Sequence, residues 1–254
     1  MGLSLSWLRC RTKRPPNGGL FIYRAGKMRT IVYIDGFNFY FGVLRGTDYK
    51  WLDIVKLVKH ICHIQNPDID IIAVKFFTAP VMTALATRGD KAGRSQDAYH
   101  RALKNSYPNT IEIINGFYVK EKATPPRYKK PADKLDRVEV WKLEEKQTDV
   151  NIALHLYRDA ILKNCECSVL VSSDSDIEPA LHFLCQDFPA HHIGLILPRR
   201  QPTEENEKTR PANASLSKLA DWTRSFIRDE ELKKCQFPPK VPTQKKPAIK
   251  PDYW

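Results

Sequence analysis

Four aspartates stand where an apolar strand gives way to a turn or a helix. Asp35 closes one predicted buried strand, and Asp174 and Asp176 directly follow another. Asp149 lies in the first turn of a predicted helix. Because ligands of open α/β sheets bind at the carboxyl ends of the strands, we expect the four carboxylates to gather at that edge.

Clustered carboxylates repel one another, so a shared site favours a proton or a cation. Hard oxygen ligands of this kind suit Mg²⁺ or Mn²⁺, and a metal ion held there could activate a water for attack on a phosphate. We predict that Asp35, Asp149 and Asp174 hold the metal, and that Asp176 completes the metal cluster or orients the water. The alternative is local: Asp176 caps the following helix and Asp174 is a turn residue.

A second group of residues is predicted to contact the substrate: Asn38, Lys146, Lys129, Lys130, Arg199 and Arg200. Asn38 falls one turn after Asp35, and Lys146 lies three residues before Asp149. The two central lysines belong to a basic segment with three prolines, 120–137, which we interpret as a mobile loop or an inserted hairpin. Such a segment could hold a phosphate backbone; the alternative is a solvated loop.

Strand and helix patterns alternate along the chain and predict how these residues are positioned. Apolar, β-branched runs predict strands at 29–35, 70–77, 110–114, 169–171 and 192–197. Helical spacing predicts helices at 52–62, 92–106 and 177–184, and another from 146, whose apolar face is predicted from Val150, Ala153, Leu154, Tyr157 and Ile161. The alternation favours a three-layer α/β/α, Rossmann-like domain with a mostly parallel sheet.

The chain of 254 residues carries a formal net charge of +12. Half of that charge lies in residues 1–27, which contain six basic residues and no acid. We expect this segment to be a disordered extension, or a misassigned start with Met28 as the true initiator. The simplest division is then one domain at 28–228 and a Pro/Lys-rich tail at 229–254, which we expect to be disordered from Gln236 onward. The basic balance indicates a polyanionic partner such as nucleic acid.

Cysteine usage and hydropathy bound the cellular context. The six cysteines show neither a disulfide framework nor zinc-ribbon spacing, which favours buried thiols in a reducing cytoplasm. No run of about 18 apolar residues exists, so we expect no membrane span. Met1-Gly2 and Ser6 match the short N-myristoylation pattern, which nothing else supports.

Three motifs carry a resemblance to a known family. The stretches YIDGFNFY (33–40), KQTDVNIAL (146–154) and SSDSDIEP (172–179) resemble, in order, the three motifs of NYN domains, and LSKLAD (216–221) is similar to the closing helix of that family. The likeness is closest to the LabA-like branch and covers roughly 29–228. NYN domains belong to the PIN-like nuclease group, so the resemblance implies a Rossmann-like α/β/α fold and Mg²⁺- or Mn²⁺-dependent cleavage of RNA.

The resemblance also implies site residues. It places the metal-binding acids at Asp35, Asp149, Asp174 and Asp176 and the asparagine of the first motif at Asn38. The chain departs from the family pattern in one position, because Ser173 stands where many members carry glycine.

The predicted function is therefore that of a cytoplasmic, metal-dependent ribonuclease with RNA as partner; homo-oligomer formation is left open. One alternative is a non-catalytic RNA-binding or regulatory module on the same fold. Another is a phosphatase or nucleotide hydrolase that uses Asp35 as nucleophile. The sequence disfavours that third class, because Gly36-Phe37 follows in place of a second acid.

Overall fold

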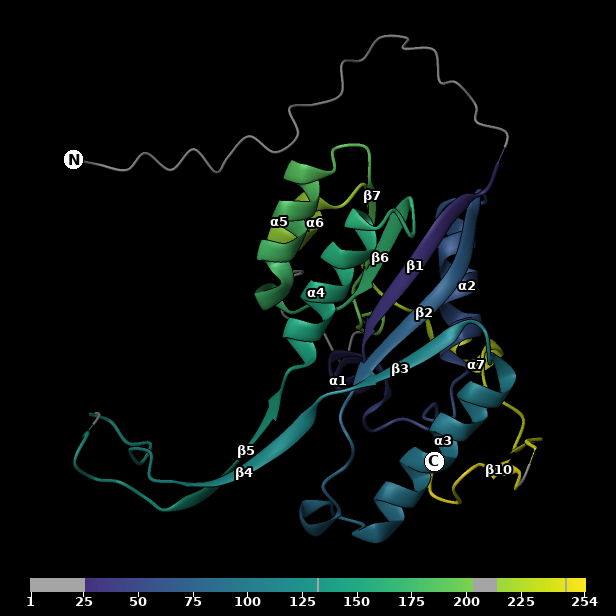
Figure 1. The fold of residues 1–254 in the computed structure, drawn as a ribbon. Coiled ribbons are helices and arrows are strands. Elements are labelled where there is room, and N and C mark those ends of the chain that lie inside the picture. Colours follow the sequence, from purple (N-terminus) through teal and green to yellow (C-terminus); the bar gives the residue numbers. More distant parts are fainter. Residues whose placement is uncertain (1–25, 132, 203–213, 245) are drawn as a thin grey trace, which may run out of the picture.

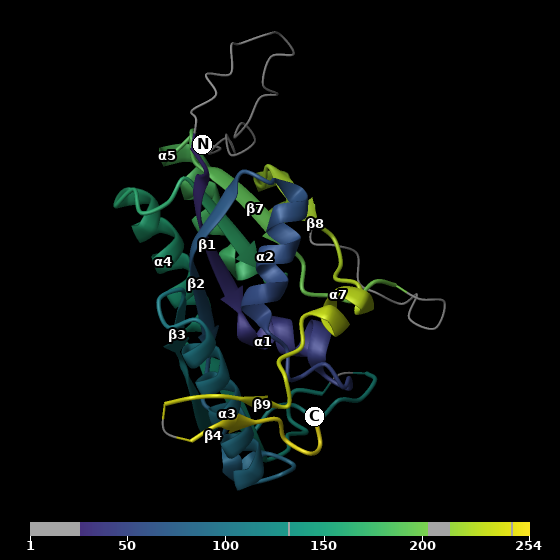
Figure 2. The same cartoon turned by 90° about the vertical axis from the view of Figure 1, so that its right-hand side faces the viewer.

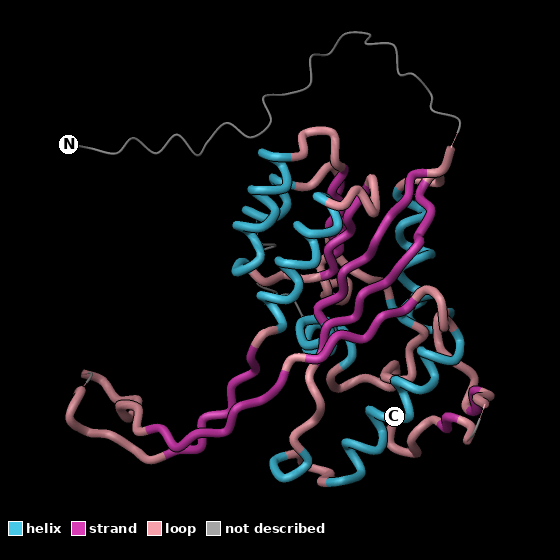
Figure 3. Tube along the Cα trace, in the orientation of Figure 1, coloured by secondary structure: helices cyan, strands magenta, loops and turns pink. Residues whose placement is uncertain are grey.

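The computed structural model describes residues 26–131, 133–202, 214–244 and 246–254. Six parallel strands form its central sheet, in the order β3-β2-β1-β6-β7-β8 (Figures 1 and 3). The strands are β1 (Met28–Asp35), β2 (Ile69–Thr78), β3 (Ile111–Asn115), β6 (Cys167–Val171), β7 (His192–Ile196) and β8 (Trp222–Arg224). The predicted α/β class with a mostly parallel sheet is confirmed.

Helices cover both faces of this sheet, as the turned view in Figure 2 shows. One face carries α2 (Ile54–Gln65) and α3 (Asp90–Ser106), and the other carries α4 (Thr148–Ile161), α5 (Glu178–Asp187) and α6 (Ala214–Leu219). Each face has its own apolar core, because the strands present alternate side chains to the two helical layers. All of β6 is completely buried, as expected of a parallel strand covered on both sides.

The strand order reverses between β1 and β6, which are neighbours in the sheet but distant in sequence. The connections that follow these two strands run in opposite directions, an arrangement that in open α/β sheets opens a crevice at the carboxyl ends of the strands. Short helical segments follow both strands there: α1 (Gly36–Phe39) and the π-helix η1 (Tyr40–Leu44) after β1, and the 3₁₀ helix η3 (Ser175–Ile177) after β6. The remaining 3₁₀ helix, η2 (Thr83–Leu85), precedes α3.

The basic segment belongs to a long antiparallel hairpin, which we call the arm: β4 (Phe117–Ala123), β5 (Val140–Lys146) and the loop between them. Figure 1 shows the arm extending away from the sheet and its helices. Among the described residues, the arm adds no side chain to either apolar core. The inserted hairpin was one of the two predicted forms of 120–137.

The C-terminal segment differs from the predicted disordered tail. It forms α7 (Asp229–Lys234), β9 (Lys240–Val241) and β10 (Ala248–Ile249), and its apolar side chains join the core on the α2 side. The fully buried ring of Trp51 contacts Phe237 and Trp254, with centroids 6.0 and 6.1 Å away. A few well-placed apolar residues outweigh the polar composition here. The domain therefore does not end at residue 228, while the predicted extension 1–27 lies almost wholly outside the described residues.

Candidate active site

Three of the four predicted aspartates come together at the carboxyl edge of β1 and β6. Asp35 ends β1, Asp174 follows β6, and Asp149 lies in the first turn of α4. One carboxylate oxygen from each lies within 4.8 Å of the others. We call this set the carboxylate triad. Within the described parts of the chain, it is the one group of three or more acidic, histidine or cysteine side chains close enough to share a metal ion.

Asp35 is the most deeply placed member, with 2% of the residue exposed. Its carboxylate accepts hydrogen bonds from the Asn38 backbone N–H at 2.9 Å and from Ser172 Oγ at 3.0 Å. Burial raises the pKa of Asp35 above its usual range, and these hydrogen bonds offset part of the effect. Neutral donors thus orient the carboxylate of Asp35, but they do not neutralise its charge.

The carboxylate of Asp149 is likewise destabilised in its charged form. Burial, and after it the charges of Asp174 and Asp35, raise its pKa to about 6. A divalent cation would relieve this repulsion, and a set made only of carboxylate oxygens fits a hard ion such as Mg²⁺ or Mn²⁺. The residues therefore suit the predicted metal.

Asp176 lies outside the triad. Its residue is exposed, and its backbone N–H donates to Asp174 Oδ1 at 3.0 Å, so Asp174 caps η3. The local alternative is thus partly realised, although Asp174 rather than Asp176 is the cap. Asp176 still contributes to the raised pKa of Asp149, as the weakest of the acidic neighbours.

Glu145 is a neighbouring acid that the sequence did not single out. It lies near the end of β5, accepts a short hydrogen bond from Thr148 Oγ1 and is partly buried. Burial raises its pKa, and the charge of Asp35 adds to the effect. The only sequence signal was its position four residues before Asp149, which is a weak one.

Asn38 bridges the two halves of the edge. Its backbone binds Asp35, and its side-chain Oδ1 accepts from Ser173 Oγ at 2.6 Å. Ser173, which departs from the NYN pattern, therefore makes a hydrogen bond that a glycine at this position could not make. Asn38 lies at the triad, as predicted, but its observed role is to join α1 to the turn after β6.

Two of the three predicted lysine contacts form ion pairs with acids outside the triad. Lys146 pairs with Glu144 at 2.9 Å, and Lys129 pairs with Asp133 and Asp136, both at 3.1 Å. Lys129 and Lys130 belong to the loop of the arm between β4 and β5, and Figure 1 shows the arm extending away from the sheet.

The two predicted arginines hold the chain near α7. Arg200 makes a two-point contact with Asp229, and Arg199 Nε donates to the Ser225 carbonyl at 2.5 Å. Of the six predicted substrate contacts, Asn38 is hydrogen-bonded to the triad through Asp35.

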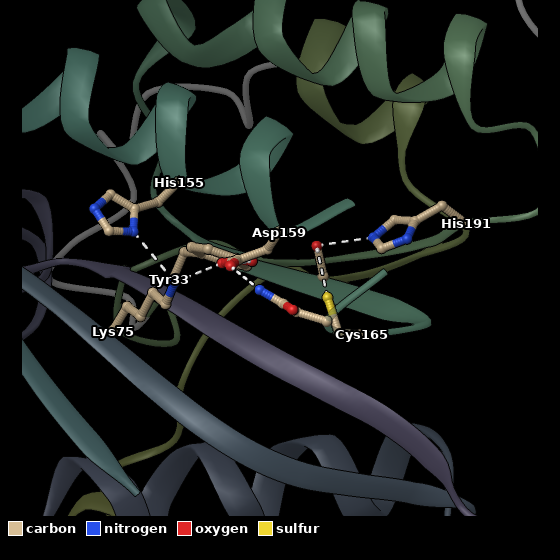
Figure 4. A network of polar contacts seen from close by, with 8 residues as sticks. Tyr33, Lys75, His155, Asp159, Cys165 and His191 are labelled. Atoms are coloured by element: carbon tan, nitrogen blue, oxygen red, sulfur yellow. Dashed lines mark hydrogen bonds and ion pairs between the residues drawn. The ribbon is translucent and has the colours of Figure 1, made fainter. Parts of the chain in front are cut away.

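A buried polar network holds α4 against the sheet (Figure 4). Asp159 of α4 accepts from Lys75 Nζ at 2.6 Å and from the Tyr33 hydroxyl at 2.7 Å. Lys75 Nζ also lies 3.2 Å from His155 Nδ1, and Asn164 donates to the other Asp159 oxygen. Because α4 carries Asp149 at its first turn, this anchor helps to fix the helix that delivers one triad member.

Comparison with known proteins gives one strong match. The chain is 38% identical, over a 252-residue alignment, to the 6-hydroxy-3-succinoylpyridine 3-monooxygenase HspA of Pseudomonas putida strain DSM 28022 / S16. The alignment covers 89% of this chain and 75% of that protein. No family model matches the chain.

A solved structure is also similar: a protein of unknown function, VPA0982 from Vibrio parahaemolyticus RIMD 2210633, aligns with a TM-score of 0.47 and 15% identity. The alignment covers 80% of this chain and 95% of that one. A likeness at this level carries no functional conclusion.

The match to a monooxygenase overturns the predicted ribonuclease function, and with it the nuclease and hydrolase class. The physical reason is that a cluster of carboxylates suits a hard cation but does not by itself specify a reaction. RNA as a partner and the NYN resemblance stay predictions. Within the described residues, no helix has the length and apolar character needed to cross a bilayer.

Proposed function

The chain belongs to the family of the 6-hydroxy-3-succinoylpyridine 3-monooxygenase HspA, and on that premise we propose that it is itself a monooxygenase of a hydroxylated pyridine. The observation that carries the proposal is 38% identity across 89% of the chain. In such a reaction one atom of O₂ enters the substrate and the other leaves as water. The two electrons come from an external two-electron donor, which the test below supplies as reduced nicotinamide.

We further propose that the carboxylate triad binds Mg²⁺ or Mn²⁺ and that the substrate binds beside it. The support is the all-oxygen set within 4.8 Å and the raised pKa of Asp35 and Asp149. A cation bound there supplies a Lewis acid for an oxygen substituent of the ring. Asn38 and Ser173 add an amide and a hydroxyl at the rim, which can hydrogen-bond polar substituents. The motifs shared with NYN domains would then mark the cation site rather than the reaction.

The test is turnover of 6-hydroxy-3-succinoylpyridine by the purified full chain with reduced nicotinamide under ¹⁸O₂. We expect one labelled oxygen atom in the product, read by mass spectrometry, and stoichiometric oxygen uptake. EDTA and Asp174→Asn should reduce the rate at least tenfold, whereas Asp70→Asn, an exposed acid at the opposite edge of the sheet, should not. Folded protein that gives no labelled product with either metal would contradict the proposal.

We propose a cytoplasmic location for this activity. The described cysteines are Cys62, Cys165, Cys167, Cys185 and Cys235; all are buried and all are thiols. Burial raises the pKa of Cys62 and Cys167, the latter to about 12, which keeps these groups protonated and unreactive. A reducing compartment suits such a set.

A further inference from the structure

Three exposed aromatic side chains closely follow Asp35 of the carboxylate triad in the chain. Phe37, Tyr40 and Phe41 come from α1 and η1, and 45%, 40% and 46% of these residues are exposed. The ring centroids of Phe37 and Phe41 lie 4.5 Å apart, and those of Tyr40 and Phe41 lie 5.3 Å apart. We call these three residues the aromatic surface. Single exposed rings are ordinary, but a contiguous group next to a polar site indicates a ligand.

The opposite side of the same segment is fixed in the protein. Phe39 and Val43 are buried in the core on the α2 side. Gly42 lies so close to the chain after β7 that an added Cβ would be 1.8 Å from the Pro198 carbonyl oxygen. Because α1 and η1 cannot rotate past these contacts, the aromatic surface is held outward.

Asn38 connects the aromatic surface to the triad. Phe37 and Phe41 lie one turn apart on one side of the helix, and Asn38, three residues before Phe41, flanks that side. Its backbone binds Asp35 and its side chain binds Ser173, so this flank of the helix meets the triad. The guanidinium of Arg45 lies 5.1 Å from the centre of the Phe41 ring and places a positive charge at the outer margin.

We propose that the aromatic surface binds the planar ring of the substrate and that Arg45 pairs with a carboxylate on its side chain. This inference rests on the proposed function, because it takes an aromatic acid as the substrate. Offset or edge-to-face contacts suit a pyridine ring against Phe37 and Phe41. The ring would then lie with its oxygen substituent toward the triad and its acidic chain toward Arg45.

The test measures equilibrium binding of 6-hydroxy-3-succinoylpyridine without reductant, by calorimetry, to wild type, Phe37→Ala and Phe41→Ala. At ~0.5–1.5 kcal/mol per aromatic contact, each substitution should raise Kd roughly 2- to 12-fold. Phe41→Trp should restore binding. The matched control is Trp141→Ala, a 64% exposed ring on the arm, which should leave Kd unchanged. Circular dichroism confirms that each variant is folded.

Arg45 is tested separately with a ligand pair. Arg45→Gln should weaken binding of the succinoyl compound about tenfold, yet leave unchanged the binding of a 3-acyl-6-hydroxypyridine that lacks the carboxylate. If wild type oxidises the substrate but Phe37→Ala, Phe41→Ala and Arg45→Gln all keep the wild-type Kd, the aromatic surface is not the binding site and the proposed function stands. Wild type that binds the ring through these residues but never incorporates oxygen would overturn the proposed function alone.

Discussion

At the scale of single residues, neutral hydrogen-bond donors contact the carboxylate triad at Asp35. Ser172 and the Asn38 backbone hydrogen-bond Asp35, but burial still raises the pKa of both Asp35 and Asp149. Neutral donors orient a carboxylate without cancelling the repulsion of its neighbours. The missing positive charge must come from a bound cation or a proton.

Divalent ions should therefore stabilise the folded protein. At a free ion concentration a hundred times Kd, binding to the folded state alone adds ~2.7 kcal/mol to the free energy of unfolding. Thermal unfolding with Mn²⁺, Mg²⁺ or EDTA measures the effect. Asp174→Asn should lose the response and Asp70→Asn should keep it. An unchanged midpoint in wild type at millimolar ion would refute metal binding at the triad.

A buried histidine should make stability fall in mild acid. His191 is 9% exposed, and its Nε2 lies 2.9 Å from Ser168 Oγ (Figure 4). Burial, and after it the charge of His192, lower its pKa from 6.5 to about 4. The unfolded chain thus takes up a proton before the folded protein does. The contribution of neutral His191 to the free energy of unfolding is complete above pH 6.5. It is lost as the pH falls toward 4, by ~3 kcal/mol.

Urea unfolding at pH 7.5, 5.5 and 4.5 measures this loss. His191→Gln keeps a polar group near Ser168 but cannot titrate, so its stability should fall less steeply than that of wild type across the window. His63→Gln, at an exposed position of α2, is the control and should follow the wild-type curve. Parallel curves for wild type and His191→Gln would show that another group causes the decline.

At the scale of elements, α4 is held by both apolar and polar contacts. Ile152, Leu156 and Ala160 form its buried side, while Val150 and Leu154 of the predicted apolar face are more than half exposed. Asp159 adds the ion pair with Lys75 on the same buried side. A helical pattern of apolar residues does not reveal which side meets the sheet when a buried acid lies on the true inner side.

Breaking the Lys75–Asp159 pair from one side should be strongly destabilising. Asp159→Ala leaves the Lys75 ammonium buried and deprives Tyr33 of its acceptor, a loss of ~3–5 kcal/mol in the free energy of unfolding. Replacing both partners, as Lys75→Met with Asp159→Leu, should cost less than Asp159→Ala alone, because no charge is left unpaired. Denaturant unfolding of Asp159→Ala, Lys75→Met, Asp159→Leu and the double variant decides; simple additivity of the Lys75→Met and Asp159→Leu effects would contradict a coupled pair.

At the scale of the whole molecule, the arm and the C-terminal segment differ in whether their side chains pack into a core. The described arm leaves Tyr128, Leu135 and Trp141 at 88%, 91% and 64% exposure and contributes to neither core. The C-terminal segment is short and polar, yet Phe237, Val241 and Ala248 are buried. Its Tyr253 hydroxyl also lies 2.6 Å from Ser95 Oγ of α3.

Two truncations should separate these parts. Removal of 237–254 uncovers Trp51 and forfeits the burial of Phe237 and Val241, at ~1.5–3 kcal/mol for each side chain. We expect a fall in the thermal midpoint of ten degrees or more, since ~1 kcal/mol corresponds to roughly 2–4 °C at this size. Replacing 125–138 by a short Gly/Ser turn should change the midpoint by only a few degrees. Equal effects would show that the arm too supports the core.

The sequence by itself determined the alternation of strands and helices, the parallel sheet and the sheet edge at which three of the four predicted aspartates meet. Those features follow from local patterns, because buried parallel strands are apolar runs and their carboxyl ends share an edge. It did not determine the reaction, since a cation site serves more than one chemistry and only the match to a monooxygenase corrected the ribonuclease prediction.

Tertiary structure alone decided that Asp176 stays outside the triad, that Glu145 lies beside it, and that the C-terminal segment packs against Trp51. It also decided which side of α4 is buried. Each of these outcomes depends on contacts between segments far apart in sequence, where the burial of a few side chains outweighs local composition and helical spacing.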